Sequence, residues 1–253
     1  MDEELCYQYW QARNIVMKMC QARKYKAEWK SLQHNSLIEF SALLEQDLSS
    51  ANEEVFMPSI GFECKNLLKN NTVSILFFKP DSTGKESIMN LLNYCYDKQI
   101  VQVILLVPYA LSHQAMEVIE NQDMKEFEAS LMKNSSKKKK KSSTPSTPTS
   151  TNSTPQKESS NTKRSIIRIE VFTLGSMQYD WTNNNLQPLV YEMSPEETKA
   201  YYEKYKYKPS QLSGLLMDNA LRKWYDFEKG QLIRLTPQNQ LNHPDYVVVG
   251  NEK

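Results

Sequence analysis

The sequence predicts an α/β protein, with a three-layer α/β domain in its N-terminal part and a small mixed α+β domain at its C-terminal end. Two apolar runs, residues 73–78 and 100–107, have the composition of buried strands and enclose a stretch with helical periodicity, residues 85–96. The order strand, helix, strand implies a right-handed crossover between parallel strands that helices cover. After residue 186, helix-capping signals alternate with a short apolar strand, which indicates a smaller mixed domain.

Composition excludes several classes of protein. The 253 residues are enough for one or two domains with their own cores, and a formal net charge of +1 gives no overall basic field, so any contact with nucleic acid has to be a local patch. No apolar run approaches the roughly 20 residues of a membrane helix. The acidic start, Met1 to Glu4, is unlike a secretory or mitochondrial presequence. We therefore expect no membrane partner.

The spacing of cysteine and histidine predicts neither a metal site nor a disulfide scaffold. Both residue types are scattered and no Cys-x-x-Cys pair occurs; the residues are Cys6, Cys20, Cys64, Cys95, His34, His113 and His243. Reduced cysteines in an intracellular protein are the plain interpretation. We expect no cofactor and no metal.

The first elements are two amphipathic helices. Asp2 can cap the first, whose core side is formed by apolar residues at helical spacing: Leu5, Tyr9, Ile15, Val16, Met19 and Cys20. The Arg23-Lys24-Tyr25 segment closes this helix. Ser36 and Glu39 form a capping box at the start of the second helix, which carries Phe40, Leu43 and Leu44.

The central layer follows. Residues 56–62 are predicted as a short strand interrupted by Pro58 and Gly61, before the two strands and the helix described above. Ser112 caps a further helix, whose pattern is lost after Leu131. Residues 133–163 have almost no large apolar side chain and include a run of five lysines, 137–141, so this insert cannot bury enough apolar surface to order itself. A last strand is expected at residues 166–172.

The C-terminal part begins with a polar connector at residues 181–185 and then a strong helix signal. Ser194, Pro195 and Glu197 form a capping box with proline at the first helical position, and the helix should run to about Tyr205. Asp218 or Asn219 can cap a second short helix. Residues 229–230 are then a turn that leads into an apolar strand at 231–235.

Two stretches imitate catalytic motifs. Residues 81–85 lie between a strand and a helix as a phosphate-binding loop would, but the early glycine is replaced by Lys79 and no hydroxyl residue follows Lys85. Glu63 and Lys65 have the Glu-x-Lys form of metal-dependent endonucleases, with Asp81 as a second carboxylate, but their order along the chain is reversed. A plain strand-to-helix turn and a noncatalytic strand are favoured.

Several short motifs in the C-terminal part carry a family resemblance. They are Pro188, residues 193–197, residues 205–206, residues 210–212 and residues 229–233. Their content and spacing resemble the C-terminal domain of the fifth subunit shared by the eukaryotic nuclear RNA polymerases, which is similar to its archaeal counterpart. The chain departs from the family at Val190, at residues 213–214 and at residues 218–219, where histidine, Pro-Arg and Asp-Pro are usual. These departures indicate a divergent member, and a virus-encoded subunit is one alternative.

The resemblance implies three parts of the chain. Residues 1–132 and 165–180 would form a jaw-like α/β domain, 133–164 a disordered Lys/Ser/Thr/Pro-rich insert, and 181–253 a polymerase assembly domain. It further implies a noncatalytic subunit of a multisubunit DNA-directed RNA polymerase. Its partners would be the largest subunit, the other subunits and downstream DNA within the complex. The nucleus is the expected location, or the virion or a cytoplasmic viral factory if the subunit is virus-encoded.

The resemblance also points to candidate site residues. The positions that match the docking-domain motifs are Pro188, Ser194, Glu197, Tyr205, Gln211, Leu212, Gly230, Leu232 and Ile233. Ser112, His113 and Gln114 stand at the helix start that lies near downstream DNA in the family, where backbone amides can meet a phosphate. Two other functions stay open: an enzyme derived from a nuclease or a nucleotide-binding α/β domain, and a free-standing DNA-binding regulator.

Overall fold

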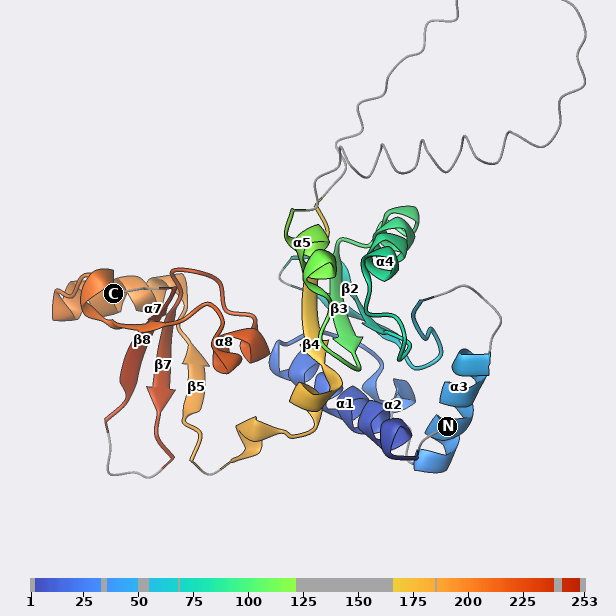
Figure 1. Ribbon diagram of the computed structural model, residues 1–253. Helices are drawn as coiled ribbons and strands as arrows, with labels where there is room; N and C mark the ends of the chain where they lie inside the picture. Colours follow the sequence, from blue (N-terminus) through green and yellow to red (C-terminus); the bar gives the residue numbers. More distant parts are fainter. Residues whose placement is uncertain are drawn as a thin grey trace, which may run out of the picture.

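The computed structural model describes residues 3–32, 36–49, 55–67, 69–121, 166–184, 186–238 and 243–250. The cap predicted at Asp2, the part of the helical pattern between residues 122 and 131, and the insert predicted at 133–164 lie outside these residues. Two four-stranded sheets organise the described chain, one formed before residue 174 and one after residue 188 (Figure 1).

The first sheet has the strand order β1-β2-β3-β4. Its strands are β1 (Phe62–Asn66), β2 (Asn71–Phe77), β3 (Gln102–Val107) and β4 (Arg168–Thr173). β1 and β2 are antiparallel, whereas β2, β3 and β4 are mutually parallel. The predicted crossover between parallel strands is therefore confirmed, with α4 (Lys85–Asp97) as its helix.

Helices cover both faces of this sheet and give three layers. We call the part of the chain that carries this sheet, up to residue 173, the first unit. Ile75 and Phe77 of β2 pack into a core with α1 (Glu3–Ala22) and α3 (Leu37–Ser49). Leu76, from the opposite face of the same strand, packs into a second core with α4 and α5 (His113–Asn121). The alternation follows from the period of two along a strand. It confirms the α/β class that the sequence predicts.

The strand expected at residues 56–62 is wrong. Phe56 makes only an isolated bridge to Phe78, and the strand begins at Phe62. A turn at residues 58–60, which includes Pro58, interrupts the segment. Gly61 then lies close to the backbone of β2, where an added Cβ would stand 2.9 Å from the carbonyl oxygen of Ile75. A short helix that the sequence did not predict, α2 (Trp29–Leu32), follows the first helix.

The second sheet has the strand order β5-β7-β8-β6. Its strands are β5 (Leu189–Glu192), β6 (Ser213–Leu215), β7 (Leu232–Thr236) and β8 (Asp245–Val249). α7 (Pro195–Tyr205) packs on one face through Tyr201, and α8 (Ala220–Tyr225) packs on the other through Leu221. Three 3-10 turns complete the chain: η1 (Leu174–Met177), η2 (Trp181–Asn183) and η3 (Pro209–Gln211).

We call the part of the chain that carries the second sheet, residues 186–250, the second unit. Both helix starts predicted in it are confirmed. The Ser194 hydroxyl accepts a hydrogen bond from the Glu197 amide at 3.2 Å, and the Glu197 carboxylate accepts one from the Ser194 amide at 2.8 Å. Asn219, and not Asp218, caps α8, because its side-chain oxygen accepts from the Leu221 amide at 2.8 Å. Local hydrogen bonds of this kind satisfy amides that the helix itself leaves free.

Candidate partner-docking site

The two units are joined through one buried arginine. Arg23 follows the last residue of α1, and its side chain is 1% exposed. Its guanidinium donates to the carbonyl oxygens of Lys223 at 2.5 Å and Trp224 at 3.0 Å, and to the carboxylate of Glu170 on β4 at 2.8 Å. The first two acceptors belong to the last turn of α8, where helix carbonyls lack partners and a cation is favoured. Arg23 therefore fastens the first unit to the second.

A second arginine reinforces this joint. Arg168 of β4 forms ion pairs with Glu170 on its own strand and with Asp226 just after α8. Burial disfavours the charged form of Arg23, but Glu170 and Asp226 outweigh that effect, and the pKa of Arg23 is raised above its ordinary value. The same two carboxylates raise the pKa of Arg168 against the opposing effect of burial. Both guanidinium groups thus stay charged at any pH at which the protein is folded.

Aromatic packing completes the joint. Trp224 of α8 is 3% exposed and belongs to the core of the first unit, although it lies in the second. The ring of Trp181 meets it edge to face, with centroids 5.4 Å apart and planes at 70°. Such pairs contribute roughly 0.5–1.5 kcal/mol beyond the area that they bury. Trp181 contacts the cores of both units, so the polar connector predicted at 181–185 has a packed residue at its start.

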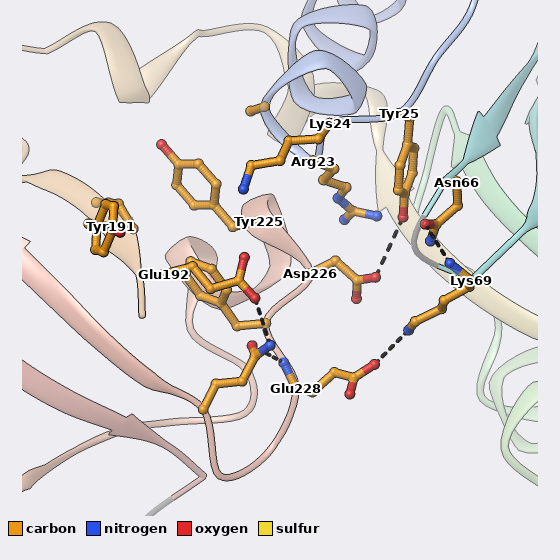
Figure 2. Close-up of a pocket in the computed structure, with 14 residues that line it drawn as sticks. Arg23, Lys24, Tyr25, Asn66, Lys69, Tyr191, Glu192, Tyr225, Asp226 and Glu228 are labelled. Carbon is orange, nitrogen blue, oxygen red and sulfur yellow. Dashed lines mark hydrogen bonds and ion pairs between the residues drawn. The ribbon is translucent and has the colours of Figure 1, made fainter. Parts of the chain in front are cut away.

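A cavity of about 380 Å³ lies beside the joint, between the two units. Figure 2 shows Lys24, Tyr25, Asn66 and Lys69 on the side of the first unit, and Tyr191, Glu192, Tyr225, Asp226 and Glu228 on the side of the second. The ammonium group of Lys69 spans the cavity to the Glu228 carboxylate at 2.6 Å. Glu192 accepts a hydrogen bond from the Gln231 amide group at 2.9 Å. The walls therefore carry charges of both signs, and several of these charges are already paired.

β5 borders this cavity and is an edge strand of the second sheet. Large apolar side chains on and before it are open to solvent, with exposed fractions of 90% for Leu186, 61% for Leu189 and 42% for Tyr191. The Tyr191 ring is held between the Arg234 guanidinium, 4.5 Å from the ring centroid, and the Glu197 carboxylate, which accepts from its hydroxyl at 2.9 Å. An exposed apolar edge strand is a surface that natural proteins cover with a partner or protect in another way.

Comparison with protein families identifies the second unit. Residues 179–246 match the family model described as RNA polymerase Rpb5, C-terminal domain. The second unit is an Rpb5 C-terminal domain. This domain indicates that the chain is an RNA polymerase subunit, as the resemblance predicted. The comparison with curated proteins found no match to the chain.

Most of the motif residues hold the Rpb5 domain together. Leu212, Leu232 and Ile233 are buried between the sheet and its helices, and Ser194 and Glu197 form the capping box of α7. The remaining motif positions mark turns and ends, namely Pro188 before β5, Tyr205 at the end of α7, Gln211 in η3, and Gly230 at a φ of +90°. The structure does not gather these residues into a single surface. Their common spacing therefore reports the fold of the domain.

The residues expected near DNA lie in the first unit, outside the Rpb5 domain. Ser112, His113 and Gln114 are all exposed at the start of α5. The Ser112 hydroxyl accepts a hydrogen bond from the Ala115 amide at 3.3 Å, and the Ser112 amide donates to the Thr83 carbonyl at 3.2 Å. The helix start is therefore fixed in place and open to solvent.

The catalytic candidates are not brought together. Glu63 stands opposite Ser74 in the middle of β2, whereas Asp81 follows the end of that strand. Among the described residues, no group of three His, Cys, Asp or Glu side chains could hold a metal ion. No described helix is long and apolar enough to cross a membrane.

Sequence reasoning missed the joint and the edge strand. Arg23 was predicted only to close a helix, and Glu170, Asp226 and Tyr191 were assigned no role. One signal in the sequence pointed to β5: the short apolar run Leu189 to Tyr191 follows Pro188, a residue confined to edges and ends of sheets. The joint has no comparable signal, because its residues are separated by 147 to 201 positions along the chain.

Proposed function

We propose that the chain is a noncatalytic subunit of a multisubunit DNA-directed RNA polymerase. The match of residues 179–246 to the Rpb5 C-terminal domain carries this proposal. Within it, the Rpb5 domain anchors the chain to the largest subunit, and the first unit contributes to the jaw around downstream DNA. Polymerase subunits of this family are noncatalytic in general, so the chemistry of RNA synthesis falls to the large subunits.

The distribution of exposed apolar side chains supports the anchoring role. Seven large apolar side chains between positions 179 and 216 are open to solvent: Tyr179, Leu186, Leu189, Tyr191, Tyr205, Tyr207 and Leu216. Apolar surface left exposed on a small domain is typical of a protein interface. Burying it on a larger subunit also stabilises the folded state by mass action.

The geometry of α5 supports a contact with DNA in the assembled polymerase. Backbone amides at a helix start can bind a phosphate without reading the base sequence. A formal net charge of +1 provides no general attraction for DNA, so this contact depends on the rest of the complex to bring DNA close. For the same reason the free-standing DNA-binding regulator is the weaker alternative.

Copurification tests the proposal. The full chain, tagged and expressed in its own host, should bring down the largest polymerase subunit, identified by mass spectrometry. Leu189→Asp should reduce the yield of that subunit, because it places a charge on the exposed apolar edge of the Rpb5 domain. Ile38→Asp, at an 81% exposed position of α3, is the matched control and should leave the yield unchanged.

The absence of any large polymerase subunit from the purified material would contradict the proposed function. Imaging of the same tagged chain tests location. We expect the nucleus, with the virion or a cytoplasmic viral factory as the alternative for a virus-encoded subunit. The reverse purification is an independent check. In it, the tagged largest subunit should bring down this chain.

A further inference from the structure

We infer that an extended segment of the polymerase subunit that holds the Rpb5 domain pairs with β5 as an added strand, at the mouth of the cavity between the two units. This inference rests on the proposed function and goes beyond it by naming the strand, its backbone groups and the chemical form of the partner. Three observations carry it: the hydrogen-bond register of β5, its exposed side chains, and the pairing of charges around the cavity.

The register of β5 leaves one set of backbone groups free. The Met193 amide donates to the Leu232 carbonyl at 3.2 Å, and Tyr191 stands opposite Arg234 in the same antiparallel pair. In an antiparallel ladder, hydrogen-bonded pairs alternate with pairs whose amides and carbonyls point away. The backbone groups of Val190 and Glu192 therefore point away from β7, toward the open edge.

No described backbone group occupies that edge. The sheet order places β5 at its end, and neither the amide nor the carbonyl of Val190 or Glu192 bonds to a backbone group among the described residues. Both residues line the cavity. Val190 and Glu192, with one residue between them, together present two amide donors and two carbonyl acceptors along the edge. Another extended chain satisfies this pattern.

The side chains favour a protein strand over a nucleic acid. Leu189 and Tyr191 project from the face of β5 opposite Val190 and are 61% and 42% exposed, so a strand laid along this edge would cover apolar surface. On the cavity side, Glu192 is bonded to Gln231, and Lys69 is paired with Glu228. Such a mixed and paired set of charges does not attract a phosphate backbone, which needs unpaired cations.

A proline placed at Val190 separates this inference from other modes of docking. Val190→Pro removes the outward amide and adds a ring at the edge, while the bonds of Tyr191 and Met193 to β7 remain. Proline is tolerated on an edge strand when its missing amide faces outward. Val190→Ala is the matched control, because it removes the same packing of the side chain and keeps the amide.

The test uses the full chain and two readouts. The wild type and Val190→Ala should recover similar amounts of the largest subunit, whereas Val190→Pro should recover about tenfold less, since a carbonyl of the partner is left without a donor. Amide hydrogen exchange over residues 188–193 should be fast in the free chain and slowed in the purified polymerase. Thermal unfolding of both variants shows that the Rpb5 domain is intact.

The outcomes are distinct. If the wild type recovers the polymerase, and Val190→Pro does so equally well with no slowing of exchange at 188–193, the strand pairing is refuted and the proposed function stands. If the wild type recovers no polymerase, the proposed function fails and takes this inference with it. If exchange at 188–193 is already slow in the isolated chain, and its mass in solution is that of a dimer, a second copy occupies the edge and the inference is overturned.

Discussion

At the scale of single residues, Arg23 links the end of α8 to β4 within the joint. Its guanidinium satisfies two carbonyl groups of α8 and one carboxylate of β4, in a site closed to water. Truncation leaves Arg168 as the remaining cation beside Glu170 and removes the donors of two carbonyl groups, and each buried polar group left unsatisfied costs about 1–3 kcal/mol. We expect Arg23→Ala to lower the melting temperature by roughly 10 °C, as measured by calorimetry.

Lys18 provides the control for this prediction. Its ammonium group lies 3.2 Å from the Asp180 carboxylate, but the side chain is 54% exposed. Exposed pairs of this kind contribute about 0–1 kcal/mol, so Lys18→Ala should shift the melting temperature by no more than a few degrees. Equal shifts for the two variants would show that the Arg23 network does not join the units.

The cysteines permit a prediction about reactivity. All four are buried, and burial raises the pKa of the Cys95 thiol to about 12. The thiolate is the reactive form, so at pH 8 a thiol reagent should label the native chain far more slowly than the denatured one. Rapid labelling of Cys95 in the native state would contradict the packing of α4.

The same shift sets the sign of a pH effect. Because the pKa of Cys95 is higher in the folded than in the unfolded state, its contribution to stability is complete below the ordinary pKa of a thiol and is lost as the pH rises toward about 12. Unfolding by denaturant between pH 8 and pH 11 should show this loss, and Cys95→Ala should remove that part of the pH dependence.

At the scale of elements, the sequence predicted those that depend on local chemistry. The start of α7 is encoded within four residues, and the structure shows both hydrogen bonds of the box. The failure at residues 56–62 has the opposite cause. The apolar residues there suggested a strand, but the close approach of the backbone at Gly61 to Ile75 of β2 depends on tertiary packing, which propensity does not include.

Gly61 therefore yields a prediction for the first sheet. A Cβ at this position would lie 2.9 Å from the Ile75 carbonyl oxygen, which belongs to the sheet backbone and cannot move freely. Gly61→Ala should destabilise the protein by about 1–3 kcal/mol, as overpacking does, in urea unfolding. Gly175→Ala is the control, since nothing lies within 4 Å of its added Cβ. A neutral Gly61→Ala would mean that β1 starts elsewhere.

At the scale of the whole molecule, the sequence predicted an α/β domain and a small mixed α+β domain but not how they are held together. Each core has local periodicity that the sequence reveals, whereas the joint depends on partners from β4 and from the ends of α1 and α8, which lie far apart in the sequence. The exposed edge of β5 could be expected only in outline, from Pro188 and the likeness to a docking domain. Its unpaired backbone groups are visible only in the register of the sheet.

The shared core at Trp224 predicts how the molecule unfolds. Trp224 packs among residues of the first unit, and Trp181 contacts the cores of both, so neither unit can unfold without exposing surface of the other. We expect hydrogen exchange in β3 and β7 to report one coincident urea transition for the wild type. Trp224→Ala removes the more deeply buried ring of the joint and should separate the two transitions, with β7 unfolding first because the second unit has the smaller core. The control is Tyr179→Ala, at an exposed position, and in this variant the two transitions should stay coincident. Separate transitions in the wild type would show that the joint transmits no stability from one unit to the other.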